Sequence, residues 1–329
     1  MKTLKDISKK DYNDYKYCLN YLKTHKTIGD EKADYNGIFH IHWRGPIDND
    51  KIILQIKSIL ATQKVSKIYF WIENFLTTIT SPGYIKLNQF RKYVEIKVFN
   101  KEIFDQVIGD KKNKERIWMY YLNYGDRRYK TDIFRLIILS IYGGVYTDAD
   151  TLLLRDVRDI KINNWSSKWG DDECAEFSIL KLEKNSDVYE QMYLNNPTNP
   201  LCFAIGNLDH TNPLTIYNSP FSYKHDNLNF TSLPSPFFDI LWGHEHCQEG
   251  KIGIHIGNVK MKTLGDIFKK TDNEITMDTF FKGCFAFHTH NYWDSPEYKY
   301  SYAGRLNEDL DKIIEQKYNI KPMKIFQGE

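Results

Sequence analysis

The chain has few of the features that mark membrane, secreted or nucleic-acid-binding proteins. Its five cysteines are scattered and form no CxxC pair, which argues against a zinc knuckle or a disulfide framework and favours a reducing compartment. No stretch approaches the ~18 apolar residues of a membrane span, and residues 1–18 lack the apolar core of a signal peptide. The net charge is only +2, so no excess of basic residues points to nucleic acid. We therefore expect a soluble, cytoplasmic protein that binds neither nucleic acid nor membrane.

The 329 residues have an ordinary composition for a folded α/β protein, with 41% hydrophobic and 27% charged residues. Aromatic residues are frequent at 15%, and such rings often line sites that stack on bases or sugars. We find no repeat or linker. We expect one large domain over residues 36–300, preceded by a helical extension (1–35) and followed by an amphipathic helix (301–329) packed on that domain.

The first hundred residues alternate between strand and helix patterns. Strands are predicted at residues 37–43, 67–73 and 93–99, and residues 48–63 have apolar side chains at helical spacing behind an aspartate cap, Asp48. This order is typical of a parallel, nucleotide-binding sheet with flanking helices. The fold class is therefore α/β.

The segment KTDIFRLIILSIYGGVYTDAD (130–150) is the most informative part of the chain. It predicts a core helix that begins behind Thr131, stops at Gly143 and leads into a strand over residues 145–154. The carboxylates Asp148 and Asp150 stand two residues apart, so on a strand they share one side.

Two converging carboxylates can hold Mg²⁺ or Mn²⁺, and with it a diphosphate. A solvated surface pair is the alternative, but open α/β sheets bind ligands at the end of a strand, where Asp148 and Asp150 are expected. Tyr146, on the same strand face, is a candidate contact to a ribose or base.

Asp132 and Arg135 are one helical turn apart on the otherwise apolar helix. A buried charge without a partner is costly, so the two are paired or meet a polar ligand. One interpretation is a purely internal salt bridge. The other is that Arg135 faces a phosphate or sugar while Asp132 holds sugar hydroxyls.

Two further segments carry candidate site residues. Residues 283–293 read as a strand in which His288 and His290 share a face, and either could complete a metal shell begun by Asp150. Trp293 follows as a candidate to stack on a sugar or cover a phosphate, with a place in the core as the alternative. His42 and Trp43 end the first predicted strand, where a tryptophan could stack on a base or belong to the core.

Together these segments resemble the DXD-containing sugar transferases, the family of fungal initiating α-1,6-mannosyltransferases, and more distantly the large clostridial glucosylating toxins. The family core SDxxRxxxLxxxGGxYxDxD is similar to residues 131–150, with threonine in place of the serine. A weaker likeness lies at residues 201–213, and His288 to Trp293 resembles the closing His-to-Trp motif, although Asn291 and Tyr292 replace an expected serine.

The resemblance implies a GT-A fold, a nucleotide-sugar donor, Mn²⁺ or Mg²⁺, retention of anomeric configuration, and a glycan, protein or lipid acceptor. By this resemblance, Trp43, beside His42, contacts the base, and Tyr146 and Asp148 contact the nucleotide. Asp132 and Arg135 hold the transferred sugar, and Trp293 contacts the leaving phosphate. The metal is bound by Asp150 and Asp148, together with His288 or His290 and with Asn291. The likeness of the first strand to the toxins, with the expected cytoplasmic location, favours a UDP-sugar over GDP-mannose.

Two other functions compete with sugar transfer. Haloacid-dehalogenase-type phosphatases also have a DxD at a strand end, but they need a small β-branched residue where this chain has Leu152. A non-catalytic nucleotide-sugar-binding module would keep the same pocket, and the intact set of Asp132, Arg135, Asp148 and Asp150 argues against such decay.

Overall fold

The computed structural model of the chain describes residues 21–29, 32–109, 111–123, 127–168, 175–186, 188, 215–216, 223–225, 229–239, 241, 254–256, 259–323, 325–326 and 328. Most of the helical extension expected at residues 1–35 therefore lies outside the described residues, as does the weaker family likeness at residues 201–213. Among the described helices, none is long and apolar enough to cross a membrane.

A mixed nine-stranded sheet forms the centre of the described structure, in the order β3-β2-β1-β4-β7-β6-β10-β9-β8. Its pairings make seven strands run in one direction, with β7 and β9 opposed. The strands are β1 (Ile38–Trp43), β2 (Lys67–Ile72), β3 (Val94–Val98), β4 (Gly144–Thr147), β6 (Trp165–Lys168), β7 (Ala175–Leu182), β8 (Thr215–Ile216), β9 (Tyr223–His225) and β10 (Phe230–Leu233).

Two small sheets lie beside the central one. They pair β11 (Ile254–Ile256) with β12 (Val259–Met261), and β13 (Ala286–His288) with β5 (Thr151–Leu153). The described helices are α3 (Asp50–Thr62), α4 (Phe75–Ile79), α5 (Pro82–Asn88), α6 (Lys101–Phe104), α7 (Lys111–Asn123), α8 (Arg127–Tyr142) and α12 (Tyr302–Tyr318), with short 3-10 turns η2 (Val157–Asp159), η3 (Ser235–Phe237) and η4 (Leu264–Phe268).

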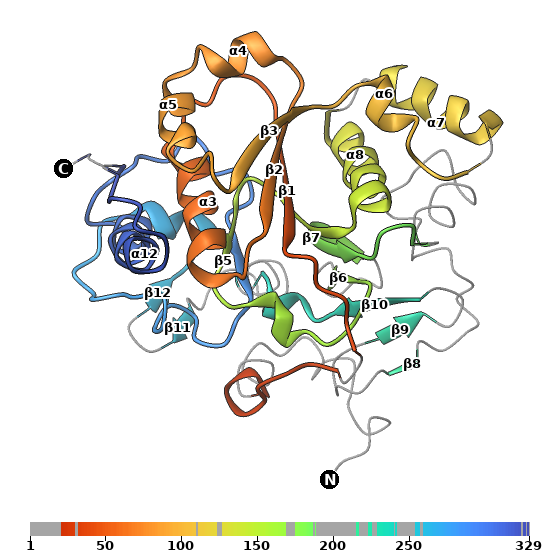
Figure 1. Ribbon diagram of the computed structural model, residues 1–329. Coiled ribbons are helices and arrows are strands. Elements are labelled where there is room, and N and C mark those ends of the chain that lie inside the picture. The colour runs from red at the N-terminus through yellow and green to blue at the C-terminus, as the bar shows by residue number, and fades with distance from the viewer. Residues whose placement is uncertain are drawn as a thin grey trace.

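The predicted parallel strands are confirmed, because β1 pairs in parallel with both β2 and β4, and β2 with β3. Helices cover both faces of this half of the sheet (Figure 1). One apolar core lies on the side of α3 and α12, and a second lies on the side of α7 and α8. The α/β class and the GT-A arrangement, a mostly parallel central sheet with flanking helices, are thus as predicted.

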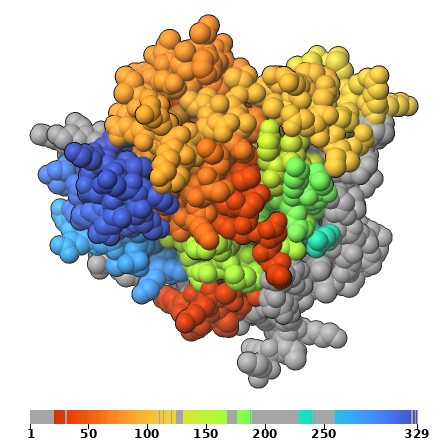
Figure 2. Space-filling model, in the orientation of Figure 1, coloured from red at the N-terminus to blue at the C-terminus, as the bar shows by residue number. Residues whose placement is uncertain are grey.

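The C-terminal helix α12 packs along α3 through both apolar and charged contacts. In the space-filling view the blue C-terminal residues lie directly against the orange residues of the α3–α5 region (Figure 2). The buried Lys57 ammonium on α3 lies 2.7 Å from the Asp311 carboxylate and donates a hydrogen bond of 2.7 Å to Asn307, both on α12. The division into three sequence regions stays a prediction.

Two predicted boundaries differ from the structure. The N-cap of α3 is Asn49, not Asp48, because the Asn49 side chain accepts a 2.9 Å hydrogen bond from the Lys51 backbone amide. Helix α8 begins at Arg127, so Thr131 lies inside it and is not its cap. The predicted end is correct: Gly143 follows the helix with φ +64°, and its amide bonds the Leu139 carbonyl at 2.7 Å.

Gly144 allows β4 to approach β1 closely. Its φ is +101°, and a Cβ atom there would lie 2.5 Å from the Ile38 carbonyl oxygen on the neighbouring strand. A side chain at this position would therefore collide with backbone that cannot move without disturbing the sheet.

We expect Gly144→Ala to destabilise the fold more than Gly45→Ala does. Gly45 also has a positive φ, +88°, but nothing lies within 4 Å of its would-be Cβ, so it controls for backbone strain. The steric clash alone should lower the free energy of unfolding by a further ~1–3 kcal/mol, measured by urea denaturation. Equal losses for the two variants would contradict the close approach.

Candidate active site between β4 and β13

The two DXD carboxylates lie in the connection between β4 and β5. The prediction of one continuous strand over residues 145–154 is wrong, because β4 ends at Thr147 and the Thr151 amide bonds the Asp148 carbonyl at 3.1 Å in a tight turn. The convergence of the carboxylates is nevertheless found. Ligand atoms of Asp148, Asp150 and His288 all lie within 4.8 Å of one another.

Asp148 is held by groups from four elements, β7, α3, β4 and α8. Its amide donates to the Ser178 carbonyl of β7 at 2.7 Å, and the side-chain amide of Gln55 on α3 donates to its carbonyl. The Tyr146 hydroxyl donates to Asp148 Oδ1 at 2.8 Å, and Arg135 lies 3.4 Å from the same oxygen. Tyr146 is only 1% exposed, so its observed contact is with Asp148; its predicted contact with the nucleotide stays a prediction.

Arg135 connects α8 to the DXD turn. Its guanidinium pairs with Asp132 at 2.8 Å, lies over the Tyr146 ring at 4.8 Å from its centroid, and donates to the Phe177 carbonyl of β7. The predicted pairing of Asp132 with Arg135 is therefore present, and it extends to Asp148. Asp132 and Arg135 are buried, whereas the Asp148 side chain is 23% exposed, so Arg135 contributes positive charge where the buried pair meets the site.

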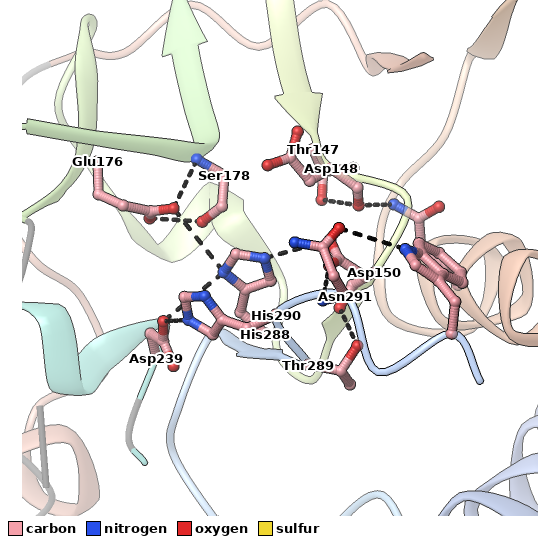
Figure 3. A network of polar contacts seen from close by, with 12 residues as sticks. Thr147, Asp148, Asp150, Glu176, Ser178, Asp239, His288, Thr289, His290 and Asn291 are labelled. Atoms are coloured by element: carbon pink, nitrogen blue, oxygen red, sulfur yellow. Dashed lines mark hydrogen bonds and ion pairs between the residues drawn. The ribbon is translucent and has the colours of Figure 1, made fainter. Parts of the chain in front are cut away.

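Asp150 is held from the other side by the strand β13 and the residues after it. The antiparallel pairing of β13 with β5 places His288 opposite Thr151, next to Asp150. His288 Nε2 lies 3.2 Å from Asp150 Oδ1, and the backbone amide of Asn291 donates a 2.7 Å hydrogen bond to Asp150 Oδ2. Figure 3 shows these groups converging on the turn, with the backbone carbonyl of Asp150 also accepting from Thr289.

The two carboxylates ionise differently because their neighbours differ. Burial raises the pKa of Asp148 to about 6, with Arg135 opposing the rise and Asp150 adding to it. Burial also opposes the ionisation of Asp150, but the charge and hydrogen bond of His288 lower the pKa of Asp150 to about 2. Conversely, although burial disfavours its cation, Asp150 and other carboxylates raise the pKa of His288 well above its ordinary value.

These residues fit a hard divalent cation. Two carboxylates at this separation repel each other when both are ionised, and a cation between them relieves that repulsion. Burial is the main cause of the raised pKa of Asp148, and the charge of Asp150 adds to it. Asp148 and Asp150 supply oxygen ligands, and His288 supplies a nitrogen within the same group. The Nε2 atom of His290 bonds the Asp239 carboxylate, and the predicted roles of His290 and Asn291 as metal ligands stay predictions.

Trp43 and Trp293 are brought together although they lie far apart in the sequence. Their rings make an edge-to-face contact with centroids 4.9 Å apart. The loop that carries Trp293 is fixed to the start of α3, since Asn49 donates to the Trp293 carbonyl at 2.8 Å and Lys51 donates to the Ser295 carbonyl at 2.8 Å. The Asn291 side chain accepts from the Trp293 indole at 3.3 Å.

His42 is buried between the sheet and α8. Its ring stacks on Phe134 at 4.3 Å, and burial together with the charges of Arg44 and Arg135 lowers the pKa of His42 to about 3. The ring is therefore neutral at physiological pH. Its predicted role in donor binding stays a prediction.

Two buried carboxylates near the site were not predicted from the sequence. Asp239 follows η3 and bonds His290, while Glu176 on β7 accepts from the hydroxyls of Ser167 and Ser178. Each has a recognisable pattern in the sequence. Asp239 is a single carboxylate in the apolar run PFFDIL, and Glu176 alternates with apolar residues in AEFSIL, which places it on one face of the strand.

Comparison with known proteins supports a sugar transferase. Residues 52–175 match the model of the family described as "Glycosyltransferase sugar-binding region containing DXD motif". This range contains Asp132, Arg135, Asp148 and Asp150, whereas Trp43 and the segment from His288 to Trp293 lie outside it. No curated protein sequence matches the chain significantly.

Several solved structures are similar at low identity. "PaToxG Glycosyltransferase" is 17% identical, with a TM-score of 0.40, 60% of this chain covered and 74% of the other. A structure described as a transferase mutant is 13% identical, with a TM-score of 0.38 and coverages of 60% and 94%. The glycosyltransferase GlyE of Streptococcus pneumoniae TIGR4 is 9% identical, with a TM-score of 0.31 and coverages of 54% and 41%.

The predicted kinship with fungal mannosyltransferases and clostridial toxins stays a prediction. The residues that match the family model include both the DXD turn and the Asp132–Arg135 ion pair. Residues 52–175 of this chain thus match the DXD-containing sugar-binding region of glycosyltransferases.

Proposed function

We propose that the chain is a metal-dependent, retaining glycosyltransferase that moves a hexose or N-acetylhexosamine from a nucleotide sugar to a glycan, protein or lipid. A UDP-sugar is the proposed donor in preference to GDP-mannose. The observation that carries the proposal is the convergence of ligand atoms of Asp148, Asp150 and His288 within 4.8 Å at the end of β4, with the Arg135 guanidinium 3.4 Å from Asp148.

In the proposed reaction the bond between the anomeric carbon and the diphosphate oxygen breaks, and the acceptor hydroxyl forms a new bond on the same face of the sugar. The acceptor's proton leaves with the diphosphate. A divalent cation at Asp148 and Asp150, Mn²⁺ or Mg²⁺, would neutralise charge that develops on the leaving diphosphate.

The chain's own residues have separate tasks in this proposal. Asp132 and Arg135 orient the transferred sugar, and the Arg135 charge adds to the stabilisation of negative charge at the site. Tyr146 and Gln55 hold Asp148 in place. Trp43 stacks on the base, and Trp293 contacts the leaving phosphate from the loop anchored to α3.

A thermal-shift screen of nucleotide sugars, with and without Mn²⁺, tests the donor assignment. We expect the largest increase in Tm with a UDP-sugar in the presence of Mn²⁺, because ligands that bind the native state stabilise it by mass action. A larger shift with GDP-mannose would overturn the choice of base. Binding without any hydrolysis or transfer of the donor would indicate a non-catalytic binding module.

We expect Asp150→Asn to remove Mn²⁺-dependent donor binding and to lower turnover on the order of 100-fold or more, because one anionic ligand is lost. The amide keeps the size of the side chain, so the fold should persist. Asp278→Asn, at an exposed position remote from the DXD turn in sequence, is the matched control. Isothermal titration with UDP and Mn²⁺ measures the effect, and wild-type affinity in Asp150→Asn would refute the assignment.

We expect Arg135→Ala to reduce both activity and stability. The substitution leaves the buried Asp132 carboxylate, and the partly exposed Asp148, without their shared cation; breaking a buried ion pair costs ~3–5 kcal/mol of unfolding free energy. Arg158→Ala breaks the more exposed pair with Asp156 and should cost no more than ~1 kcal/mol.

Urea denaturation and donor hydrolysis, measured on the same Arg135→Ala preparation below its unfolding transition, separate the two effects. A loss of stability with turnover intact would show that the Asp132–Arg135 pair is only an internal salt bridge.

A further inference from the structure

His288 presents its two ring nitrogens to two different sets of carboxylates. Nε2 faces the DXD turn, 3.2 Å from Asp150 Oδ1. Nδ1 faces the opposite way, 3.6 Å from Asp239 Oδ2 and 3.8 Å from Glu176 Oε1. The proposed function uses only the side of the ring that faces Asp150.

The second side of the ring borders a compact group of three ligand-type side chains. Ligand atoms of Asp239, His288 and His290 all lie within 4.8 Å of one another, and the two imidazoles stack with centroids 3.8 Å apart (Figure 3). Two local features bring them together. His290 has φ +46°, which turns the chain after β13, and the Phe285 amide bonds the Phe237 carbonyl at 2.8 Å, which fixes the segment leading to Asp239.

Two buried polar atoms in this group have no hydrogen-bond partner among the described residues. They are Asp239 Oδ1 and His288 Nδ1, on side chains that are only 4% and 8% exposed. Buried polar atoms are nearly always satisfied, and leaving one unsatisfied costs ~1–3 kcal/mol. Both atoms belong to the same group, so a single bound species can satisfy them together.

We propose that Asp239, His288 Nδ1 and His290 form a second cation site, separate from the DXD turn. Two imidazole nitrogens and one carboxylate are a ligand set for Zn²⁺ or a similar first-row transition metal, whereas Mg²⁺ and Ca²⁺ prefer oxygen. Three protein ligands leave one tetrahedral position for water. Glu176, whose oxygens accept from Ser167 and Ser178, adds negative charge next to the site.

The second ion would determine which ring nitrogen of His288 carries the proton, and therefore how His288 interacts with Asp150. An ion on Nδ1 leaves Nε2 to carry a proton and donate it to Asp150, 3.2 Å away. His288 would then orient Asp150, and the cation at the DXD turn would be held by Asp148, Asp150 and the donor diphosphate. This site does not depend on the proposed sugar transfer, since it forms without a nucleotide.

Metal content measured without any nucleotide tests the proposal. Protein stripped with a chelator, reloaded with Zn²⁺ and dialysed is analysed by mass spectrometry for bound zinc. We expect one retained Zn²⁺ per wild-type chain, and a loss of at least tenfold in its affinity in Asp239→Asn and in His290→Gln. Asp278→Asn and His25→Gln, which alter residues outside the group, should keep the ion.

Asp150→Asn separates the two sites. It should keep the zinc while losing Mn²⁺-dependent UDP binding. Asp239→Asn should lose the zinc and retain Mn²⁺-dependent UDP binding, weakened only through the lost orientation of His288. Zinc content unchanged in Asp239→Asn and His290→Gln, or no zinc retained by the wild-type protein, would overturn the second site. Zinc lost equally in Asp150→Asn and Asp239→Asn would also overturn it, because the two groups would then form one site.

A zinc-edge anomalous difference map of wild-type crystals decides the matter if a variant fails to fold. A peak between the Asp239 carboxylate and the two imidazoles supports the proposal, and a peak only at the DXD turn, or no peak, contradicts it. Failure of donor binding in the same crystals would instead bear on the proposed transferase function.

Discussion

The mutual repulsion of two closely spaced carboxylates is the constraint on which the rest of this site depends. Asp148 and Asp150 come from one tight turn, and each is compensated from a different side. Arg135, delivered by α8, lies 3.4 Å from Asp148, and His288, delivered by β13, lies 3.2 Å from Asp150. The helix and the strand therefore supply the charges that allow the two carboxylates to lie close together at the end of β4.

The fold serves this arrangement by placing three distant segments around one turn. The parallel pairing of β1 with β4 fixes the position of the turn at the carboxyl end of β4. Gly144 permits the close approach that this pairing requires. The pairing of β5 with β13 brings in the histidines. Contacts from the start of α3 fix the loop with Trp293 against Trp43. A cation with a nucleotide diphosphate, as proposed, would lie where these segments meet.

Local sequence patterns predicted part of this structure well. The strands and helix of the first hundred residues follow hydrophobic periodicity, and the Asp132–Arg135 pair follows from helical spacing, so both could be read directly. The single strand predicted over residues 145–154 was wrong because alternation continues through the turn at Asp148 and Asp150. Asp239 and Glu176 were missed because their proximity to His288 arises from long-range pairing, which one sequence does not reveal.

The most direct test of the central claim is a crystal structure of the protein with Mn²⁺ and UDP, with anomalous data collected at the manganese edge. The account predicts a manganese peak coordinated by Asp148 and Asp150 and by the diphosphate, with the uracil near Trp43. UDP bound without manganese at these carboxylates, or manganese bound only elsewhere, would contradict it.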